Sequence, residues 1–570
     1  MALTRRHFVG SLLATSMLAA TAPAQVRRGS ATRPNIITIV LDDVGYSDLG
    51  CFGSEIRTPN IDRLANAGLR YARFDTKAVC SATRAALMTG RNSHTVNMSD
   101  VPDLAAFLTK AEADSRFYIP DSAWNMPQVL KRAGYSTWAI GKWHLIPGRE
   151  LPENAVHKSW PRQRGFDYFY GYAKGWTDQY KPDLVENDTY LKREFPDNYH
   201  LSVDLTDKAI SLIERHLDSG TAGPFYLNLA YGTAHSPIQV PREYSRKYDA
   251  VYAKGWDVVR SERFQRMKRM GIIPENTDLS DRTSSDRAWA DLEPAERQVF
   301  ARYMAVYAGF IEHCDEQLGR FLDMLDARGL SHNTLIMLFS DNGPASEAGQ
   351  AGEFDGLYNA NTIPIEEQVR RIDELGTPKL QSEYPRPWAL VGSTPLQRYK
   401  LWPYSGGTRT PMIVRWPATI AHSGAIRHQY VDVIDVAPTL LAAAGTSFPK
   451  AVDGVPQLPV AGRSFLTSFT SPRAPGREVQ YFELRGNRAI TAGRWRAVAM
   501  HDCDTPFEQD KWELYDLQND FSESVNLAAR YPAKVDQMKS LWAAEWQLFG
   551  SGPMREPPKF ACASGGALLR

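Results

Sequence analysis

Oxygen-bearing residues that suit a metal ion occur as two pairs in the sequence. Asp42 and Asp43 follow one short apolar segment, and Asp341 and Asn342 follow another much later in the chain. Carboxylate and amide oxygens are ligands for a hard divalent cation such as Ca²⁺ rather than for Zn²⁺. Asp and Asn also begin turns after strands, but two adjacent carboxylates repel each other without a counter-cation. The two pairs therefore predict a metal site.

A cysteine and an arginine share one helical pattern. Cys80 opens the stretch CSATRAALMT, in which small and helix-forming residues around Arg84 predict a helix that begins at the cysteine. The free amides and the dipole of a helix N-terminus favour an anion at that position. A lone free cysteine is more often a buried packing residue, and composition alone favours that interpretation.

Lysine and histidine follow two further apolar segments. Lys142 and His144 follow one of them, and His235 follows the other. A histidine in isolation is more often a satisfied core or surface residue, so only the position at the end of a strand gives these two weight. Four segment ends that carry metal-binding or anion-binding residues form a pattern that is hard to obtain by accident.

These residues need an α/β framework to bring them together. Short apolar segments alternate with helical patterns, which indicates a large, mixed but mostly parallel sheet sandwiched by helices. In open α/β sheets ligands bind outside the carboxyl ends of the strands, where the residues above are expected. The predicted strands are Asn35–Leu41, Thr137–Ile140, Phe225–Ala230, Thr334–Phe339 and Met412–Val414. The predicted helices include Pro59–Ala67, Met126–Ala133, Leu205–Leu217 and Arg297–Ala327.

The pattern divides the rest of the chain into a catalytic domain at 33–470 and a C-terminal subdomain at 471–570. Beyond residue 470, shorter alternating segments and a closing helix predict a small antiparallel sheet with one helix. Two long stretches within the catalytic domain, 245–296 and 344–399, are typical of insertions. Loops of that length are usually functional or disordered.

Residues 1–24 have the features of an export signal. Arg5 and Arg6 precede an apolar stretch that is too short to span a bilayer, and a small-x-small pattern ends at Ala24. The string TRRHFVG resembles the twin-arginine motif of proteins that are exported already folded. The protein is therefore expected to be periplasmic or secreted, with the twin-arginine export machinery as a partner. An uncleaved N-terminal anchor is the alternative.

Composition excludes several classes of protein. There are 66 Lys and Arg against 65 Asp and Glu, and the net charge of +1 provides no basic surface for nucleic acid. Aromatic residues make up 11% of the 570 residues, which argues against disorder. The five cysteines form no CxxC pair, so neither a zinc ribbon nor a dense disulfide scaffold fits. A large soluble enzyme without stable membrane association remains.

Several sequence blocks together resemble one enzyme family. CSATR at 80–84, followed by TGR at 89–91, is similar to the C-x-(P or A)-x-R…TGR signature of the type I sulfatases. LDDVGYSDLG, TPNIDRLANAG, GKWH, SDNG and GGTRTP occur in the order of that family, so the resemblance covers roughly residues 33–530. Within the family the chain is most similar to bacterial arylsulfatases. The resemblance implies the fold of the alkaline-phosphatase superfamily.

The resemblance also implies a nucleophile. In sulfatases the motif cysteine is oxidised after translation to formylglycine, an aldehyde that hydrates to a gem-diol. One hydroxyl attacks sulfur and expels the alcohol, and the second loses its proton so that sulfate is eliminated and the aldehyde re-forms. Applied to Cys80, this implies a formylglycine-generating enzyme as a partner. Ala82 stands where many members have proline, which leaves open which system modifies this cysteine.

The remaining roles are those that the family pattern implies. Arg84, Lys142 and Lys400 would provide positive charge to the sulfate and formylglycine oxygens. His144 would deprotonate the spare hydroxyl, and His235 would lie near the leaving group. One Ca²⁺ would act as a Lewis acid on a sulfate oxygen. Its ligands would be Asp42, Asp43, Asp341 and Asn342.

The expected activity is that of a sulfuric ester hydrolase acting on aryl or alkyl sulfates. A phosphonate monoester or phosphodiester hydrolase on the same scaffold is the alternative, because such enzymes share the modified cysteine and the metal ligands. A binding protein without activity would lack ligands, and none is missing. Ser405 replaces the glutamate that usually precedes the Gly-Gly pair, which we expect to affect loop packing rather than the sulfate site. The sequence does not identify the natural ester: a bulky aromatic leaving group is favoured, and a sulfated sugar is the alternative.

Overall fold

The computed structural model describes residues 33–220, 223–357 and 362–557 of the chain. Its main sheet is built from β1 (Asn35–Leu41), β2 (Leu69–Tyr71), β4 (Ser136–Lys142), β5 (Tyr168–Tyr172), β6 (Val185–Glu186), β7 (Thr189–Tyr190), β8 (Phe225–Ala230), β9 (Thr334–Ser340), β10 (Met412–Arg415) and β11 (Ala425–Arg427). The ten strands are ordered β11-β2-β10-β9-β1-β8-β4-β5-β6-β7. The predicted export signal at 1–24 lies outside the described residues.

The centre of the main sheet is parallel. Five neighbouring strands run in the same direction, namely β9, β1, β8, β4 and β5. On one side of this group β10 is antiparallel to β9, and on the other β6 is antiparallel to β5 and β7 is antiparallel to β6. The expected mixed, mostly parallel sheet of an α/β protein is thus confirmed. In the register of β1 and β9, Leu41 is paired with Ser340, so Asp42 and Asp341 leave the sheet side by side.

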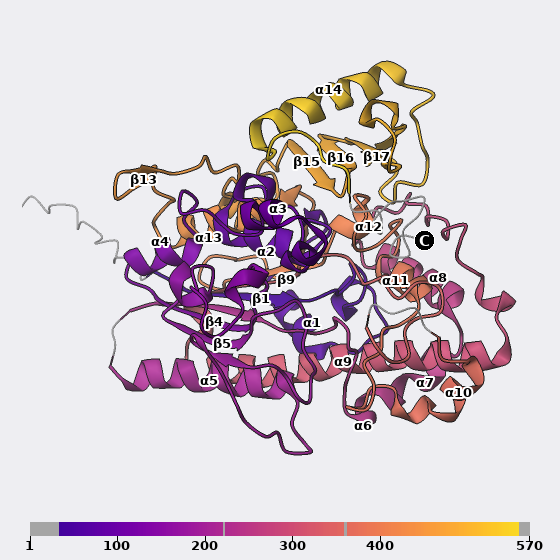
Figure 1. Ribbon diagram of the computed structural model, residues 1–570, viewed down its shortest axis with the longest axis horizontal. Coiled ribbons are helices and arrows are strands. Elements are labelled where there is room, and N and C mark those ends of the chain that lie inside the picture. Colours follow the sequence, from indigo (N-terminus) through magenta and orange to yellow (C-terminus); the bar gives the residue numbers. More distant parts are fainter. Residues whose placement is uncertain (1–32, 221–222, 358–361, 558–570) are drawn as a thin grey trace, which may run out of the picture.

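Helices cover both faces of this sheet, as Figure 1 shows. The principal ones are α1 (Pro59–Asn66), α2 (Cys80–Thr89), α4 (Met126–Arg132), α5 (Leu201–Asp218), α9 (Pro294–Ala327) and α13 (Val436–Ala443). Successive side chains of a strand point to opposite faces of its sheet. Ile37 and Ile39 of β1 accordingly share one buried cluster with residues of α1, α5 and α9. Ile36 and Val40 share the other with residues of α4, α13 and the second half of α2.

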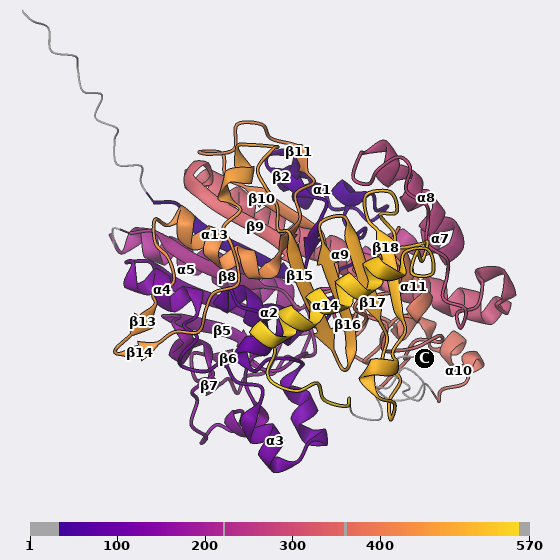
Figure 2. The ribbon, with the colours of Figure 1, turned by 90° about the horizontal axis from the view of Figure 1, so that it is seen from above.

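The C-terminal part of the chain forms a second, antiparallel sheet. It consists of β15 (Val479–Leu484), β16 (Asn487–Ala492), β17 (Trp495–Ala499) and β18 (Trp512–Asp516), and α14 (Pro532–Phe549) lies across it in Figure 2. Tyr481, Ile490 and Trp542 belong to a small buried cluster between this sheet and α14. The expected antiparallel sheet with one helix is therefore confirmed, while the domain boundary at 470 stays a prediction.

The two stretches interpreted as insertions contain helices. The first includes α7 (Asp249–Tyr252) and α8 (Trp256–Arg269), and the second includes α10 (Ile365–Arg370) and α11 (Arg386–Gly392). The rings of Trp256 and Trp388 meet edge to face with their centroids 5.7 Å apart, so the two stretches pack on each other.

Shorter elements complete the described part of the chain. They include β3 (Phe74–Asp75), β12 (Val431–Asp432), β13 (Ala451–Val452), β14 (Val455–Pro456), α3 (Lys110–Ser115), α6 (Arg242–Ser245), α12 (Ser405–Thr408) and the 3₁₀ helices η2 (His94–Val96) and η3 (Pro102–Phe107). Within the described ranges, none of the helices combines the length and the apolar character that crossing a bilayer requires.

Candidate active site

Three side chains that can bind a cation meet at the carboxyl edge of the main sheet. One ligand atom each from Asp42, Cys80 and Asp341 lies within 4.8 Å of the others, and all three residues are buried. Asp42 follows β1 directly and Asp341 follows β9 directly, so the register of these strands sets their separation. Cys80 is brought to them as the first residue of α2.

Asp43 and Asn342 lie beside this group. The Asn342 side-chain amide donates to Asp43 Oδ1 at 2.6 Å, and the Asp43 backbone N–H donates to Asp341 Oδ1 at 3.4 Å. Asp43 has a φ of 58°, a left-handed conformation that asparagine and aspartate adopt more readily than most residues. This turn directs the second carboxylate of the Asp-Asp pair back towards the sheet edge.

Three cations are paired with the three carboxylates. Lys142 Nζ lies 2.7 Å from Asp42 Oδ2, and Lys400 Nζ lies 2.9 Å from Asp43 Oδ2. The Arg84 guanidinium donates to Asp341 Oδ2 from Nε at 3.0 Å and from Nη2 at 2.7 Å. These pairs are almost completely buried, and a buried charge without a partner would be very costly.

The pKa values reflect electrostatic repulsion between the neighbouring carboxylates. Burial, followed by the negative charge of Asp341, raises the pKa of Asp42 to about 8, although Lys142 and Arg84 act in the opposite direction. Burial also raises the pKa of Asp341, but Arg84 and Lys142 outweigh it and hold that pKa below its usual value. A bound cation would relieve the repulsion between the two carboxylates.

The oxygens present fit a hard divalent cation. Among the described residues, Asp42 Oδ1 and Asn342 Oδ1 are buried and have no hydrogen-bond partner. Buried polar oxygens are normally satisfied, so two orphaned ones at the same place indicate a ligand. Carboxylate and amide oxygens are the donors that Ca²⁺ prefers.

Cys80 occupies the predicted position at a helix N-terminus, but it is also deeply buried. Burial raises the pKa of its thiol to about 12, and the charges of Lys142 and Lys400 offset this only in part. Both sequence-based interpretations of Cys80, as a helix-terminal residue and as a buried one, therefore hold. In this environment an unmodified cysteine is a thiol at neutral pH rather than a thiolate nucleophile.

The two predicted histidines lie at the rim of the cluster. His144 Nε2 lies 2.7 Å from Asp103 Oδ2, and within the described chain its buried Nδ1 has no hydrogen-bond partner. His235 Nδ1 lies 2.7 Å from the Ser236 carbonyl, and its Nε2 lies 3.7 Å from Asp43 Oδ2. Burial lowers the pKa of both rings, and Lys400 and then Lys142 lower that of His235 further.

The ten residues predicted from the sequence thus gather in one buried cluster, while three neighbours were missed. Asp103 bonds to His144, Glu347 Oε1 lies 2.8 Å from Lys400 Nζ, and Gly175 packs against the His144 ring. Glu347 lies in the stretch 344–399, where the composition carries no local pattern. Asp103 follows a proline in an irregular segment, so neither residue could be recognised from spacing alone.

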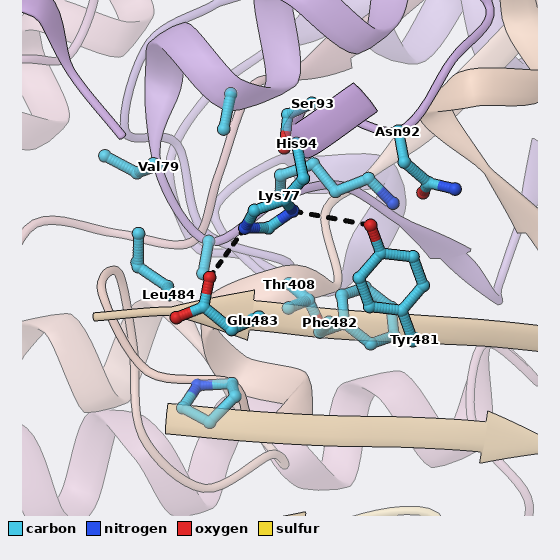
Figure 3. Close-up of a pocket in the computed structure, with 13 residues that line it drawn as sticks. Lys77, Val79, Asn92, Ser93, His94, Thr408, Tyr481, Phe482, Glu483 and Leu484 are labelled. Carbon is cyan, nitrogen blue, oxygen red and sulfur yellow. Dashed lines mark hydrogen bonds and ion pairs between the residues drawn. The ribbon is translucent and has the colours of Figure 1, made fainter. Parts of the chain in front are cut away.

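A small cavity lies near the start of α2, and none of the ten predicted site residues lines it. Figure 3 shows it between Lys77, Val79 and His94 on one side and residues of β15 on the other. Its volume is about 20 Å³, which is room for about one water molecule. His94 Nε2 lies 2.6 Å from Glu483 Oε2 across it, so the cavity belongs to the contact between α2, η2 and the C-terminal sheet.

Comparison with known proteins agrees with this geometry. The family model described as Sulfatase matches residues 34–446, and the model described as N-sulphoglucosamine sulphohydrolase, C-terminal, matches residues 398–543. An arylsulfatase of Klebsiella aerogenes is 30% identical over 468 residues, which cover 80% of this chain and 95% of the relative. An uncharacterized sulfatase of Schizosaccharomyces pombe is 30% identical over 533 residues, which cover 90% and 94%.

Solved structures share the fold. The crystal structure of Ps i-CgsB in complex with k-i-k-neocarrahexaose has a TM-score of 0.63 at 22% identity, and the match covers 92% of this chain and 95% of the other. The phosphonate monoester hydrolase of Agrobacterium radiobacter has a TM-score of 0.55 at 17% identity, with 90% and 96% covered. At these identities the likeness establishes the common architecture.

Proposed function

The chain belongs to the sulfatase family of hydrolases, and from this premise we propose that it cleaves aryl or alkyl sulfate esters with a formylglycine at position 80 and a bound Ca²⁺. One observation carries the proposal. Cys80 is held at the N-terminus of α2 with its sulfur among the ligand atoms of Asp42 and Asp341. A nucleophile at this position would lie beside the residues that would hold the cation.

Asp42, Asp43, Asp341 and Asn342 would hold the cation. When bound, Ca²⁺ polarises a sulfate oxygen and favours the ionised form of the attacking hydroxyl. Lys142, Lys400 and Arg84 pair with these carboxylates, and their N–H groups would supply positive charge to the sulfate oxygens.

The proposed nucleophile is the hydrate of formylglycine at position 80. One hydroxyl attacks sulfur while the S–O bond to the alcohol breaks, and the second loses its proton so that sulfate leaves and the aldehyde re-forms. His144 is suited to accept that proton. Its Nε2 faces the Asp103 carboxylate, so the proton on the neutral ring lies there and Nδ1 is left as the base.

His235 would act at the leaving alcohol. Its Nδ1–H donates to the Ser236 carbonyl, so Nε2 carries the lone pair that faces the site. Nε2 can therefore accept the proton that the attacking hydroxyl releases and deliver it to the oxygen of the leaving alcohol. Export through the twin-arginine machinery to the periplasm or medium, and modification of Cys80 by a formylglycine-generating enzyme, complete the proposal.

Mass spectrometry and paired kinetics test this function. The tryptic peptide that contains position 80 should be lighter than its cysteine form, as expected when an aldehyde replaces a thiol. The purified enzyme should hydrolyse para-nitrophenyl sulfate with a higher kcat/KM than the matching phenylphosphonate ester. Chelation should remove activity and Ca²⁺ should restore it, and Cys80→Ala should lower kcat by more than about a thousandfold.

Two outcomes would contradict the proposal. An active enzyme with unmodified cysteine at position 80 would exclude the formylglycine. A clear preference for the phosphonate would favour the alternative hydrolase on the same scaffold.

A further inference from the structure

Arg485 occupies an unusual place in the C-terminal sheet. It forms the two-residue turn between β15 and β16 together with Gly486, and the two residues have φ values of 53° and 82°. Hairpin turns with two positive φ values strongly prefer Asn, Asp or Gly. An arginine here works against the local preference of the backbone, and such residues often serve a function.

The side chain of Arg485 is buried and only partly satisfied. Its Nε lies 2.7 Å and its Nη2 lies 3.2 Å from the two carboxylate oxygens of Asp100, a side-on pair that leaves Nη1 over. The side chain is 7% exposed, and Nη1 has no hydrogen-bond partner in the described part of the chain. Unpaired buried donors are rare in folded proteins, so this one needs an explanation.

Arg485 belongs to a cleft that approaches the candidate base along one short helix. It lines a cleft of about 440 Å³ together with Asn97, Ser99, Asp100 and Leu104. Leu104 belongs to η3, and Asp103, the residue before it, contacts His144. The lining of the cleft is therefore one residue of η3 away from the contact with the candidate base.

The charged groups that interact with Arg485 also include residues of the buried cluster. Burial lowers the pKa of Arg485, but Asp100, followed by Glu347 and Cys80, raises it above its ordinary value. Glu347 is the carboxylate that pairs with Lys400. The guanidinium is therefore within electrostatic reach of Cys80 and of Glu347.

We propose that Arg485 is a specificity-determining residue whose Nη1 donates a hydrogen bond to an oxygen of the leaving alcohol. The inference rests on the proposed function, because it concerns the alcohol side of the same ester. Asp100 already offsets the charge of Arg485, so the recognised group is a neutral hydroxyl near the ester rather than a second anion. The C-terminal sheet thereby contributes to substrate choice.

A matched pair of chromogenic esters tests this role. Nitrocatechol sulfate carries a hydroxyl next to the ester, and para-nitrophenyl sulfate lacks it. In Arg485→Lys, which keeps a charge for Asp100, and in Arg485→Asn, which suits the turn, the ratio of kcat/KM for the two esters should shift about tenfold against nitrocatechol sulfate. Arg494→Lys is the control, because Arg494 precedes β17 and pairs with Asp516 on the same sheet.

Each outcome decides a different question. A ratio of kcat/KM values that stays at the wild-type value in both Arg485 variants overturns the hydroxyl subsite. This includes an equal loss of activity on both esters, which a purely structural role would give. A shift in Arg494→Lys of the same size also overturns it. A wild-type enzyme that hydrolyses neither ester overturns the proposed function itself.

Discussion

The orientation of His144 depends on residues that take no part in the chemistry. Asp103 holds Nε2, and His144 itself has a φ of 57°, which is uncommon for a non-glycine residue. Gly175 covers the ring, because a Cβ at that position would lie 2.7 Å from His144 Cε1 and 2.8 Å from Nε2. Contacts under 3.0 Å force one of the partners to move. The absence of a side chain at position 175 therefore leaves the room that the His144 ring needs in this position.

Gly175→Ala should displace the candidate base and leave the fold intact. We expect kcat to fall by about a hundredfold, since a shift of about 1 Å at a reacting group has that effect. Gly148→Ala is the matched control, because no atom lies within 4 Å of a Cβ there. Steady-state kinetics and thermal unfolding of both variants provide the measurement. A wild-type kcat in Gly175→Ala would show that the ring position is unimportant.

Residues that follow strands or belong to a family motif could be predicted from the sequence, whereas residues that reach the cluster only by tertiary contact could not. Asp42 and Asp341 could be found because the end of a buried strand is a local signal that also defines a place in the fold. Gly175 and Arg485 carry no such signal. Their roles arise from a ring and a carboxylate that lie far away along the chain.

At the scale of elements, the same division holds for strands. β1 and β8 were predicted with their observed bounds because each is a continuous apolar segment buried on both faces. The short strands β6, β7 and β11, near the two ends of the sheet, were not predicted, since two or three residues contain no measurable periodicity. Their pairing depends on tertiary structure, that is, on which strand edges the rest of the chain leaves unpaired.

The junction of α5 and α9 contains two buried histidines. His200 precedes α5, where its Nδ1 accepts from the Ser202 backbone N–H and its Nε2 donates to the Gln239 carbonyl. The ring of His313, on α9, has its centroid 4.3 Å from that of His200. Burial lowers the pKa of His200 to about 4 and that of His313 to about 2. Both rings are thus neutral in the folded protein.

Acid should therefore destabilise this junction. The unfolded chain takes up protons near the ordinary histidine pKa of 6.5, whereas the folded chain does so only near 4 and 2. Stability is complete above about pH 6.5 and falls below it by about 1.4 kcal/mol per pH unit for each histidine. Urea unfolding between about pH 7 and pH 5 should show a shallower loss in His313→Phe than in the wild type. Equal slopes would contradict this account.

At the scale of the whole molecule, one buried carboxylate connects the C-terminal sheet to the segment that bears Lys400. Glu523 Oε2 accepts from the Ser405 backbone N–H at 3.0 Å, and Oε1 accepts from the Ser405 hydroxyl. Arg496 of β17 forms an ion pair with Glu523 at 3.0 Å. A carboxylate from a distant segment thus satisfies Ser405. The expectation that the departure at Ser405 affects loop packing rather than the sulfate site stays a prediction.

Glu523→Gln should weaken this connection without changing its size. An amide offers one acceptor oxygen where the carboxylate offers two, so either the Ser405 N–H or its hydroxyl loses its partner inside the protein. We expect the free energy of unfolding to fall by about 2 kcal/mol, the typical cost of an unsatisfied buried donor. Because Ser405 closely follows Lys400, kcat/KM for a sulfate ester should fall as well. Glu508→Gln, at an exposed site of the same C-terminal part, should leave both quantities unchanged. If the two variants behave alike in denaturant titrations and kinetics, then Glu523 does not transmit the position of the C-terminal sheet to the Lys400 segment.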